Sequence, residues 1–147
     1  MALFQGFDIA ASGMTAERFR MDTISENLAN VNTTRTEDGG PYRRKVVTFE
    51  EKNLNAGFAD TLEDYKKAFK GDGVKVSRVY EDTDTDMTLV YDPSHPDANQ
   101  NGYVTYPNVN TVTEMTNLID ATRAYQANVT SFNALKDIAT TGLQIGS

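Results

Sequence analysis

Apolar residues recur at alternating intervals of four and three positions along the N-terminal part of the chain. The series consists of Leu3, Phe7, Ala10, Met14, Met21, Ile24, Leu28 and Val31, with Glu17 as a charged position inside it. This repeat of about 3.5 residues is typical of a helix that packs against another helix. Gly6 and Gly13 each weaken a helix by about 1 kcal/mol. We therefore predict a helix from about Leu3 to about Asn30 whose first half depends on a partner.

A second series with the same spacing occupies the end of the chain. Its members are Met115, Leu118, Thr122, Tyr125, Val129, Phe132, Lys136, Ala139 and Leu143. Thr111, followed three residues later by Glu114, is typical of a capping box and predicts a helix start just after Pro107. Two matching stripes at opposite ends of one chain predict an antiparallel coiled-coil hairpin.

The residues between the two stripes have a mixed pattern. Several short runs have the composition of strands, and the second of them alternates apolar with polar residues; they are 45–49, 74–80, 87–91 and 102–106. Aromatic and leucine residues at helical spacing predict a short helix near 58–70. The turn-rich segment DPSHPDANQNG is expected to form a surface loop.

These patterns predict an α+β fold in which the long N- and C-terminal helices form the hairpin and a small β-rich domain is inserted between them. We expect the parts to be an N-terminal helix at 1–34, a β-rich middle domain at 35–109 and a C-terminal helix at 110–147.

Composition excludes several classes of protein. The net charge of -7 argues against nucleic-acid binding, and the absence of cysteine excludes disulfides, thiolate metal sites and cysteine nucleophiles. The N-terminal segment lacks the basic start and continuous apolar run of a cleaved leader. No apolar run approaches the roughly 20 residues that cross a bilayer, so no transmembrane helix is expected.

Two features resemble chemical sites in part. Asp82, Asp84 and Asp86 have the first spacings of an EF-hand calcium loop, but Met87 and Pro93 replace the required glycine and glutamate. A solvated acidic turn is favoured over calcium binding. The single histidine, His95, lies between prolines without a triad pattern around it, so we expect neither a hydrolase nor a cofactor.

The basic residues Arg43, Arg44 and Lys45, with Arg35 nearby, allow two interpretations. One is an ordinary solvated face. The other is contact with carboxylates of a neighbouring copy, which would determine register more than it would add affinity.

Three runs of the sequence resemble the bacterial flagellar basal-body rod proteins, and they cover well over half of the chain. The most specific matches are residues 27–30, 103–109 and 123–128. The runs are FDIAASGMTAERFRMDTISENLANVNTTRTEDGGPYRRKVVTFE, GYVTYPNVN and MTNLIDATRAYQANVTSFNALKDIATTGLQIG. The run GYVTYPNVN favours a subunit of the proximal rod over another axial protein of the rod or hook.

The resemblance implies a structural subunit, not an enzyme, that polymerises into the rod and transmits torque from the motor to the hook. It implies export through the flagellar type III apparatus without a cleaved signal, and a location in the basal body within the cell envelope. The expected partners are copies of the chain, other rod proteins, the adaptor at the rod base and the export apparatus, with no nucleic acid and no membrane insertion.

In this family the terminal helices pack between copies to form an inner tube. We therefore expect the assembly interface to use apolar positions together with amides that specify register. The apolar positions are Phe7, Met14, Met21, Ile24, Leu28, Leu118, Tyr125, Val129 and Phe132, and the amides are Asn27, Asn30, Gln126 and Asn128.

Overall fold

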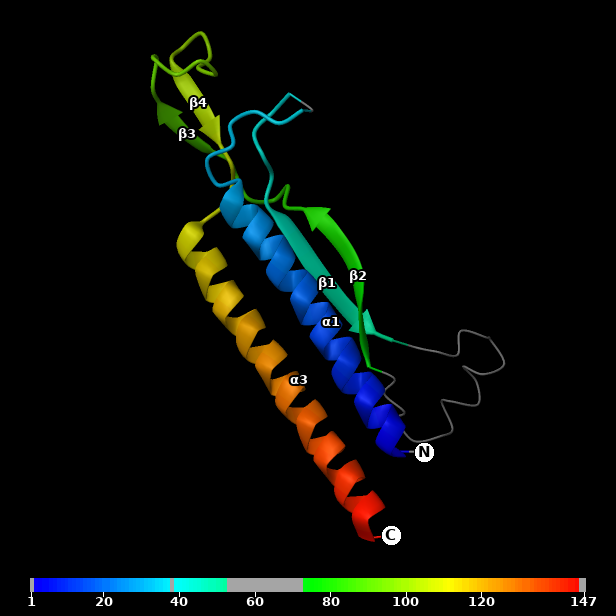
Figure 1. Cartoon of the computed structure of the whole chain (residues 1–147). Helices are drawn as coiled ribbons and strands as arrows, with labels where there is room; N and C mark the ends of the chain where they lie inside the picture. Colours follow the sequence, from blue (N-terminus) through cyan, green and yellow to red (C-terminus); the bar gives the residue numbers. More distant parts are fainter. Residues whose placement is uncertain (1, 38, 53–72, 146–147) are drawn as a thin grey trace, which may run out of the picture. The chain divides into compact units, whose positions relative to one another are not determined.

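The computed structural model describes residues 2–37, 39–52 and 73–145 (Figure 1). Their fold is α+β, as the sequence predicts, and the helix predicted near 58–70 lies outside the described residues. In chain order the elements are α1 (Ala2–Ala29), β1 (Lys45–Glu51), β2 (Val74–Glu81), β3 (Thr88–Tyr91), β4 (Tyr103–Tyr106) and α3 (Thr111–Ile145). Each of these elements occurs close to its predicted bounds.

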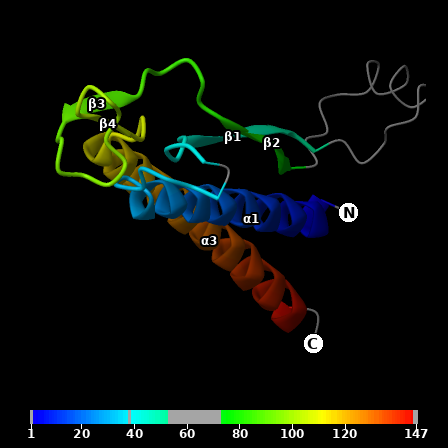
Figure 2. The same cartoon turned by 90° about the horizontal axis from the view of Figure 1, so that it is seen from above.

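The described strands form two separate two-stranded sheets, β1–β2 and β3–β4. Strands β3 and β4 are antiparallel and lie side by side in Figures 1 and 2. Their register pairs Thr88 with Tyr106, Leu89 with Thr105, Val90 with Val104, and Tyr91 with Tyr103. Because successive residues of a strand point to opposite faces, this register decides which side chains share each face of the hairpin.

The chain divides into two compact units, and each helix contributes to both of them. Unit 1 contains residues 1–19, 48–77 and 121–147, whereas unit 2 contains residues 20–47 and 78–120. Each unit therefore combines part of α1, strand residues and part of α3.

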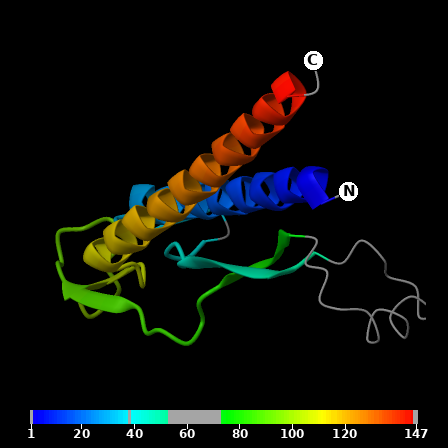
Figure 3. The same cartoon turned by 90° about the horizontal axis from the view of Figure 1, so that it is seen from below.

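In unit 1 the two helical segments pack in antiparallel directions. The rings of Phe7 and Phe132 meet edge to face, with centroids 4.9 Å apart and an interplanar angle of 69°. Gly6 lies opposite Leu135 and Gly13 lies opposite Asn128. Beyond these contacts the C-terminal end of α3 runs away from α1 (Figures 2 and 3). The helices thus pack as a pair, and a regular coiled coil along their length remains a proposal.

The glycines of α1 permit this close packing. A Cβ atom at Gly13 would lie 2.7 Å from Asn128 Oδ1, and one at Gly6 would lie 3.0 Å from Leu135 Cδ1. Contacts below about 3.0 Å force a neighbour to move, so these positions favour glycine for steric reasons. Helix propensity alone reveals only the cost of these glycines.

Unit 1 also holds the start of β2 against α1. Ser12 Oγ donates to Ile9 O over 2.7 Å and accepts from the backbone N–H of Val74 over 3.0 Å. Gly73 has a φ of 102°, and a Cβ there would lie 2.2 Å from Ser12 Oγ. Glycine is therefore required at this approach both by the backbone conformation and by the available space.

The inward face of α3 follows the predicted stripe along its middle and departs from it at three positions. Six members of the stripe are half-buried as expected, and three are exposed: the first are Leu118, Thr122, Tyr125, Val129, Phe132 and Ala139, and the exposed ones are Met115, Lys136 and Leu143. Four residues that directly precede members of the predicted stripe are also buried or half-buried: Glu114, Ala121, Asn128 and Leu135. At Met115 the prediction was wrong because the adjacent Glu114, a charged residue that pairs with Arg44, is the buried one. At Lys136 the half-buried neighbour is Leu135.

Candidate functional site: helix faces and a buried polar cluster

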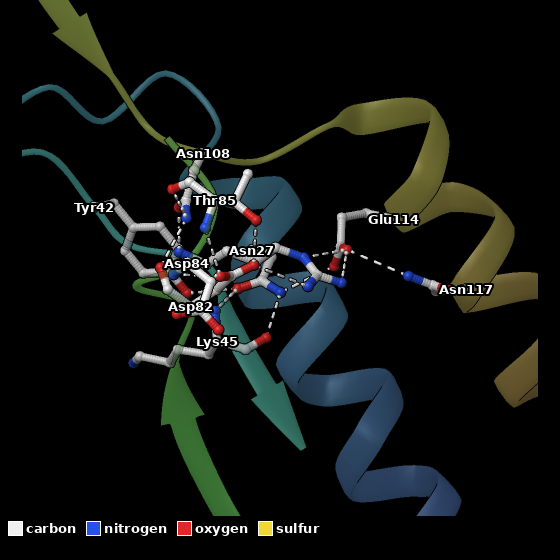
Figure 4. Close-up of polar contacts among 10 residues, drawn as sticks. Asn27, Tyr42, Lys45, Asp82, Asp84, Thr85, Asn108, Glu114 and Asn117 are labelled. Atoms are coloured by element: carbon white, nitrogen blue, oxygen red, sulfur yellow. Dashed lines mark hydrogen bonds and ion pairs between the residues drawn. The ribbon is translucent and has the colours of Figure 1, made fainter. Parts of the chain in front are cut away.

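A cluster of buried polar side chains joins the elements of unit 2 (Figure 4). We call it the unit 2 polar cluster; it consists of Asn27, Tyr42, Arg44, Asp82, Asn108 and Glu114. Asn27, near the end of α1, is 1% exposed. Its Nδ2 donates to Lys45 O and to Glu114 Oε2, while its Oδ1 accepts from Lys45 N and Tyr42 Oη, each over 2.9 Å. The amide is therefore fully hydrogen-bonded between three segments.

Glu114 places a carboxylate in this buried environment from the first turn of α3. It is 0% exposed, and its Oε1 accepts from Arg44 Nε over 2.9 Å and pairs with Arg44 Nη2 at 2.8 Å. Arg44 also pairs with Asp82, with Nη1 and Oδ2 separated by 3.5 Å. A buried carboxylate needs such a partner, because desolvation of an unpaired charge is costly.

Asn108 ties the entry to α3 to the rest of the cluster. Its Oδ1 accepts from Arg44 N over 2.9 Å, and its Nδ2 donates to the backbone oxygens of Asp82 over 2.8 Å and Thr85 over 3.2 Å. Because both ends of the amide are used, the segment before α3 is held against β1 and the acidic turn within unit 2.

The acidic turn uses its first carboxylate internally. Asp82 accepts from the backbone and hydroxyl of Thr85 and from the backbone N–H of Asp84, and these bonds hold its pKa below the usual value. The described residues contain no group of three His, Asp or Glu side chains placed to hold a metal ion. Asp82 is thus occupied by hydrogen bonds within the turn and by its ion pair with Arg44.

Tyr42 donates its hydroxyl proton to Asn27 and is itself buried. Burial raises the pKa of Tyr42 well above its ordinary value, and the nearby carboxylates of Glu26, Glu114 and Glu81 raise it further. The hydroxyl therefore stays protonated and remains a donor.

The basic cluster pairs mainly within its own chain. Arg44 binds Glu114 and Asp82, as described above, and Lys45 Nζ binds Glu26 Oε1. Neither of the two interpretations fits Arg44. Its side chain is only 24% exposed, and it pairs with the carboxylates of Asp82 and Glu114 in its own chain. The pattern of charges alone could not reveal these partners, which lie far away in the sequence.

The predicted capping box is also wrong. Asn110 is the N-cap of α3: its Oδ1 accepts from Val112 N over 3.0 Å and from Thr113 N over 3.1 Å. Thr111 is not the cap, and Glu114 directs its carboxylate to Arg44 and Asn27. The signal for the actual cap was the asparagine itself, a preferred N-cap residue.

The predicted interface residues differ in how far their own chain covers them. Ile24 and Asn27 are buried, and Gln126 is exposed. Asn30 and Asn128 donate within their own helices, to Glu26 O and Ala124 O respectively. The remaining positions are half-buried and keep surface for a neighbour: Phe7, Met14, Met21, Leu28, Leu118, Tyr125, Val129 and Phe132.

A further apolar face on α3 was absent from the predicted interface. Val112, Met115 and Ile119 are exposed and recur at helical spacing, so they share one face in unit 2. Only Met115 belonged to the predicted stripe, and it was read there as an inward position. A second helical period, offset from the first, was the signal in the sequence.

Comparison with known proteins decides the family. A relative from Bacillus subtilis (strain 168), the flagellar basal-body rod protein FlgC, is 45% identical over 99% of this chain and 99% of its own length. The chain belongs to the flagellar basal-body rod protein family. Residues 7–35 match the family profile "Flagella basal body rod protein", and residues 100–145 match "Flagellar basal body rod FlgEFG protein C-terminal".

Other FlgC relatives of this rod protein give the same result. The protein from Borreliella burgdorferi is 43% identical over 99% of this chain and 98% of its own length. The protein from Escherichia coli O6:H1 is 41% identical over 99% of both chains. The resemblance to basal-body rod proteins is confirmed.

The chain is thus a structural rod protein of the flagellar basal body, and its family implies assembly with other rod components. The relatives are structural proteins and indicate no enzymatic family. Among the described residues, no helix is long and apolar enough to span a membrane.

Proposed function

We propose that this rod protein polymerises into the proximal rod and there transmits torque from the motor to the hook. The FlgC relatives, which are similar over nearly their whole length, support this placement. Another axial subunit of the rod or hook is the alternative within the same structural class.

The observation that carries the proposal is the incomplete cover of the helix seam. Eight of the expected interface residues are only half-buried in the single chain, and both helices expose further large apolar side chains. Contiguous exposed apolar surface is typical of protein interfaces. If copies bind through two different surfaces that do not close into a ring, the product is a helical filament.

Within the assembled rod, we infer a division of the chain into three parts. Residues 1–34 and 110–147 provide the helical core, in which a coiled-coil hairpin forms, and residues 35–109 provide the β-rich domain. The edge-to-face contact of Phe7 with Phe132 supports close packing of the two helices. Dense packing of this kind resists deformation, which a torque-bearing shaft requires.

The unit 2 polar cluster gives such a subunit a defined register. A slip of α3 by one turn would separate Glu114 from Arg44 and Asn27, leaving buried polar groups unpaired at about 1–3 kcal/mol each. We infer that the amides Asn27, Asn30, Gln126 and Asn128 serve register within and between subunits. Of these, Asn27 has the strongest support, because it bridges α1 and α3.

We further infer that the chain leaves the cytoplasm through the flagellar type III apparatus. Its partners are then copies of itself, other rod proteins, the adaptor at the rod base and the export apparatus. The rod lies within the cell envelope and needs no cofactor, enzymatic activity, nucleic acid or membrane insertion for this role.

Motility tests the seam directly. In a strain whose only copy of the gene carries Phe132→Asp or Leu28→Asp, we expect swimming to be abolished, because a charge enters an apolar contact. The exported subunit should still be detected outside the cytoplasm by immunoblotting. Phe132→Leu is the matched control, because it keeps the position apolar, and it should swim. Normal swimming by either aspartate variant would contradict the seam assignment.

A further inference from the structure

The β3–β4 hairpin presents an apolar, aromatic face to solvent. The register places Leu89 opposite Thr105 and Tyr91 opposite Tyr103, so these four side chains share one face. Leu89 is 63% exposed, Tyr91 65% and Tyr103 43%. The other face carries Val104, which is fully buried. On that other face its partner Val90 is 41% exposed, so the two faces differ mainly in that Val104 is covered. The face with Leu89, Tyr91 and Tyr103 is here called the hairpin face.

The two tyrosine rings of the hairpin face are held in place. Tyr91 and Tyr103 meet edge to face, with centroids 5.2 Å apart. Gly102 has a φ of 78°, and a Cβ there would lie 2.9 Å from Tyr91 Cε2 and 3.2 Å from Pro93 Cβ. The missing side chain at Gly102 thus lets the Tyr91 ring lie close to the backbone. An exposed aromatic ring that is already ordered loses little conformational entropy when it binds a partner.

The loop that joins the two strands supports this arrangement. Asn99 Oδ1 accepts from Asn101 N over 2.9 Å and from Tyr103 N over 3.0 Å. Asp92 N donates to Gly102 O over 2.9 Å, and Asp92 Oδ1 accepts from Ser94 N over 3.1 Å. These bonds connect both ends of the loop to the strands. The hairpin face is therefore built on a hydrogen-bonded frame.

The charge along the chain around this face is acidic, and Arg35, which pairs with Asp97 of the loop at 3.8 Å, is a basic residue beside it. Between residues 79 and 122 the sequence has no lysine or arginine, whereas eight aspartates and glutamates occur there. Asp84 and Asp86 are exposed in the turn that precedes β3, and Asp92 follows β3 directly. The exposed aromatic rings thus lie on a strand flanked by carboxylates.

The two units differ in net charge, and this difference identifies the kind of partner. Unit 2 contains six basic and twelve acidic residues, for a net charge of -6, whereas unit 1 contains eight and nine, for a net charge of -1. Contact between the hairpin faces of two copies would therefore be opposed by repulsion. An arginine or lysine offers attraction to carboxylates and a cation–π contact with tyrosine rings.

We propose that the hairpin face docks a basic surface of a different protein, through arginine or lysine side chains seated on Tyr91 and Tyr103. This contact is additional to the helix seam that joins rod subunits. It gives the acidic hairpin a heterologous partner, whereas the helix seam, which has residues in both units, serves assembly between copies.

Solution NMR of the full-length chain tests this proposal with a defined probe, an acetylated pentapeptide of alternating arginine and leucine. We expect saturable shifts of the backbone amides of residues 89–91 and 103–105. The matched peptide with glutamate in place of arginine should shift none of them. Tyr91→Ala should weaken arginine-peptide binding about fivefold, the size of an exposed cation–π contact. Leu143→Ala, at an exposed apolar position outside the hairpin, should leave binding unchanged.

A second variant removes charge without removing packing. The double substitution Asp84→Asn and Asp86→Asn should weaken binding at low salt and reduce its dependence on salt. Equal binding of the glutamate peptide, or shifts confined to residues outside the hairpin, would overturn the proposal. Concentration-dependent shifts of the hairpin amides without peptide would overturn it in favour of a second copy. All of these measurements use the free chain. Their outcome therefore does not depend on whether the chain polymerises into a rod.

Discussion

Removing the Asn27 side chain is the most informative perturbation of the unit 2 polar cluster. Asn27→Ala deletes four hydrogen bonds of 2.9 Å at a position that is 1% exposed. The groups left behind are the backbone N–H and C=O of Lys45, the hydroxyl of Tyr42 and one carboxylate oxygen of Glu114. Because each is in or near a buried environment, water can replace the amide only in part.

The expected cost follows from these groups. A neutral hydrogen bond contributes about 1 kcal/mol net, and one to a charged group about 1.5–3 kcal/mol. Allowing for relaxation, we expect Asn27→Ala to lower the free energy of unfolding by about 3–5 kcal/mol. Asn27→Asp should also be strongly destabilising, because it places a second carboxylate beside Glu114.

Urea unfolding of the full-length chain, followed by circular dichroism, measures this loss. Asn30→Ala is the matched control, because its amide has only local partners: it donates to Glu26 O and accepts from Thr33 Oγ1. We expect it to cost less than Asn27→Ala, at about 1 kcal/mol. Equal unfolding midpoints for Asn27→Ala and Asn30→Ala would refute the reasoning that the cluster holds the three segments together.

Two further predictions concern the glycines and the pH dependence of stability. Gly142→Ala should stabilise α3 by about 0.5–1 kcal/mol, because a Cβ there meets nothing within 4 Å. Gly13→Ala should give no gain in stability, because its Cβ would meet Asn128. Equal urea midpoints for the two variants would contradict this prediction. Because the folded pKa of Asp82 is lowered, its contribution to stability is present above its unfolded pKa of about 3.9 and is lost as pH falls through the folded value. The raised pKa of Tyr42 has the opposite sign, so its contribution is lost as pH rises above about 10. Urea midpoints measured across pH should show both losses, and Asp82→Asn should reduce the acid loss; an unchanged acid limb would contradict the role of Asp82.

The helices and strand β2 could be predicted because each has a clear period, and the other strands because of their composition. The repeat of about 3.5 residues identified α1 and α3, and the alternation over 74–80 identified β2. The resemblance of whole runs then gave the family, which the FlgC relatives confirm. These signals are local in the sequence, so they need no knowledge of the fold.

The packing partners could not be predicted in the same way. Glu114 is a charged residue that the fold buries because Arg44, seventy positions earlier, lies against it. Gly13 was read as a weak helix position, although its role is to admit Asn128. Both depend on which segments meet in the folded unit, and a hydrophobic pattern carries no information about a buried ion pair.

Electron microscopy of basal bodies tests the central claim, that this chain is a building block of the rod, most directly. Basal bodies would be isolated from a strain lacking the gene and from the same strain carrying it on a plasmid. We expect the deletion strain to have no completed rod and no hook, and the plasmid to restore both. Complete rods bearing hooks in the deletion strain would contradict the claim.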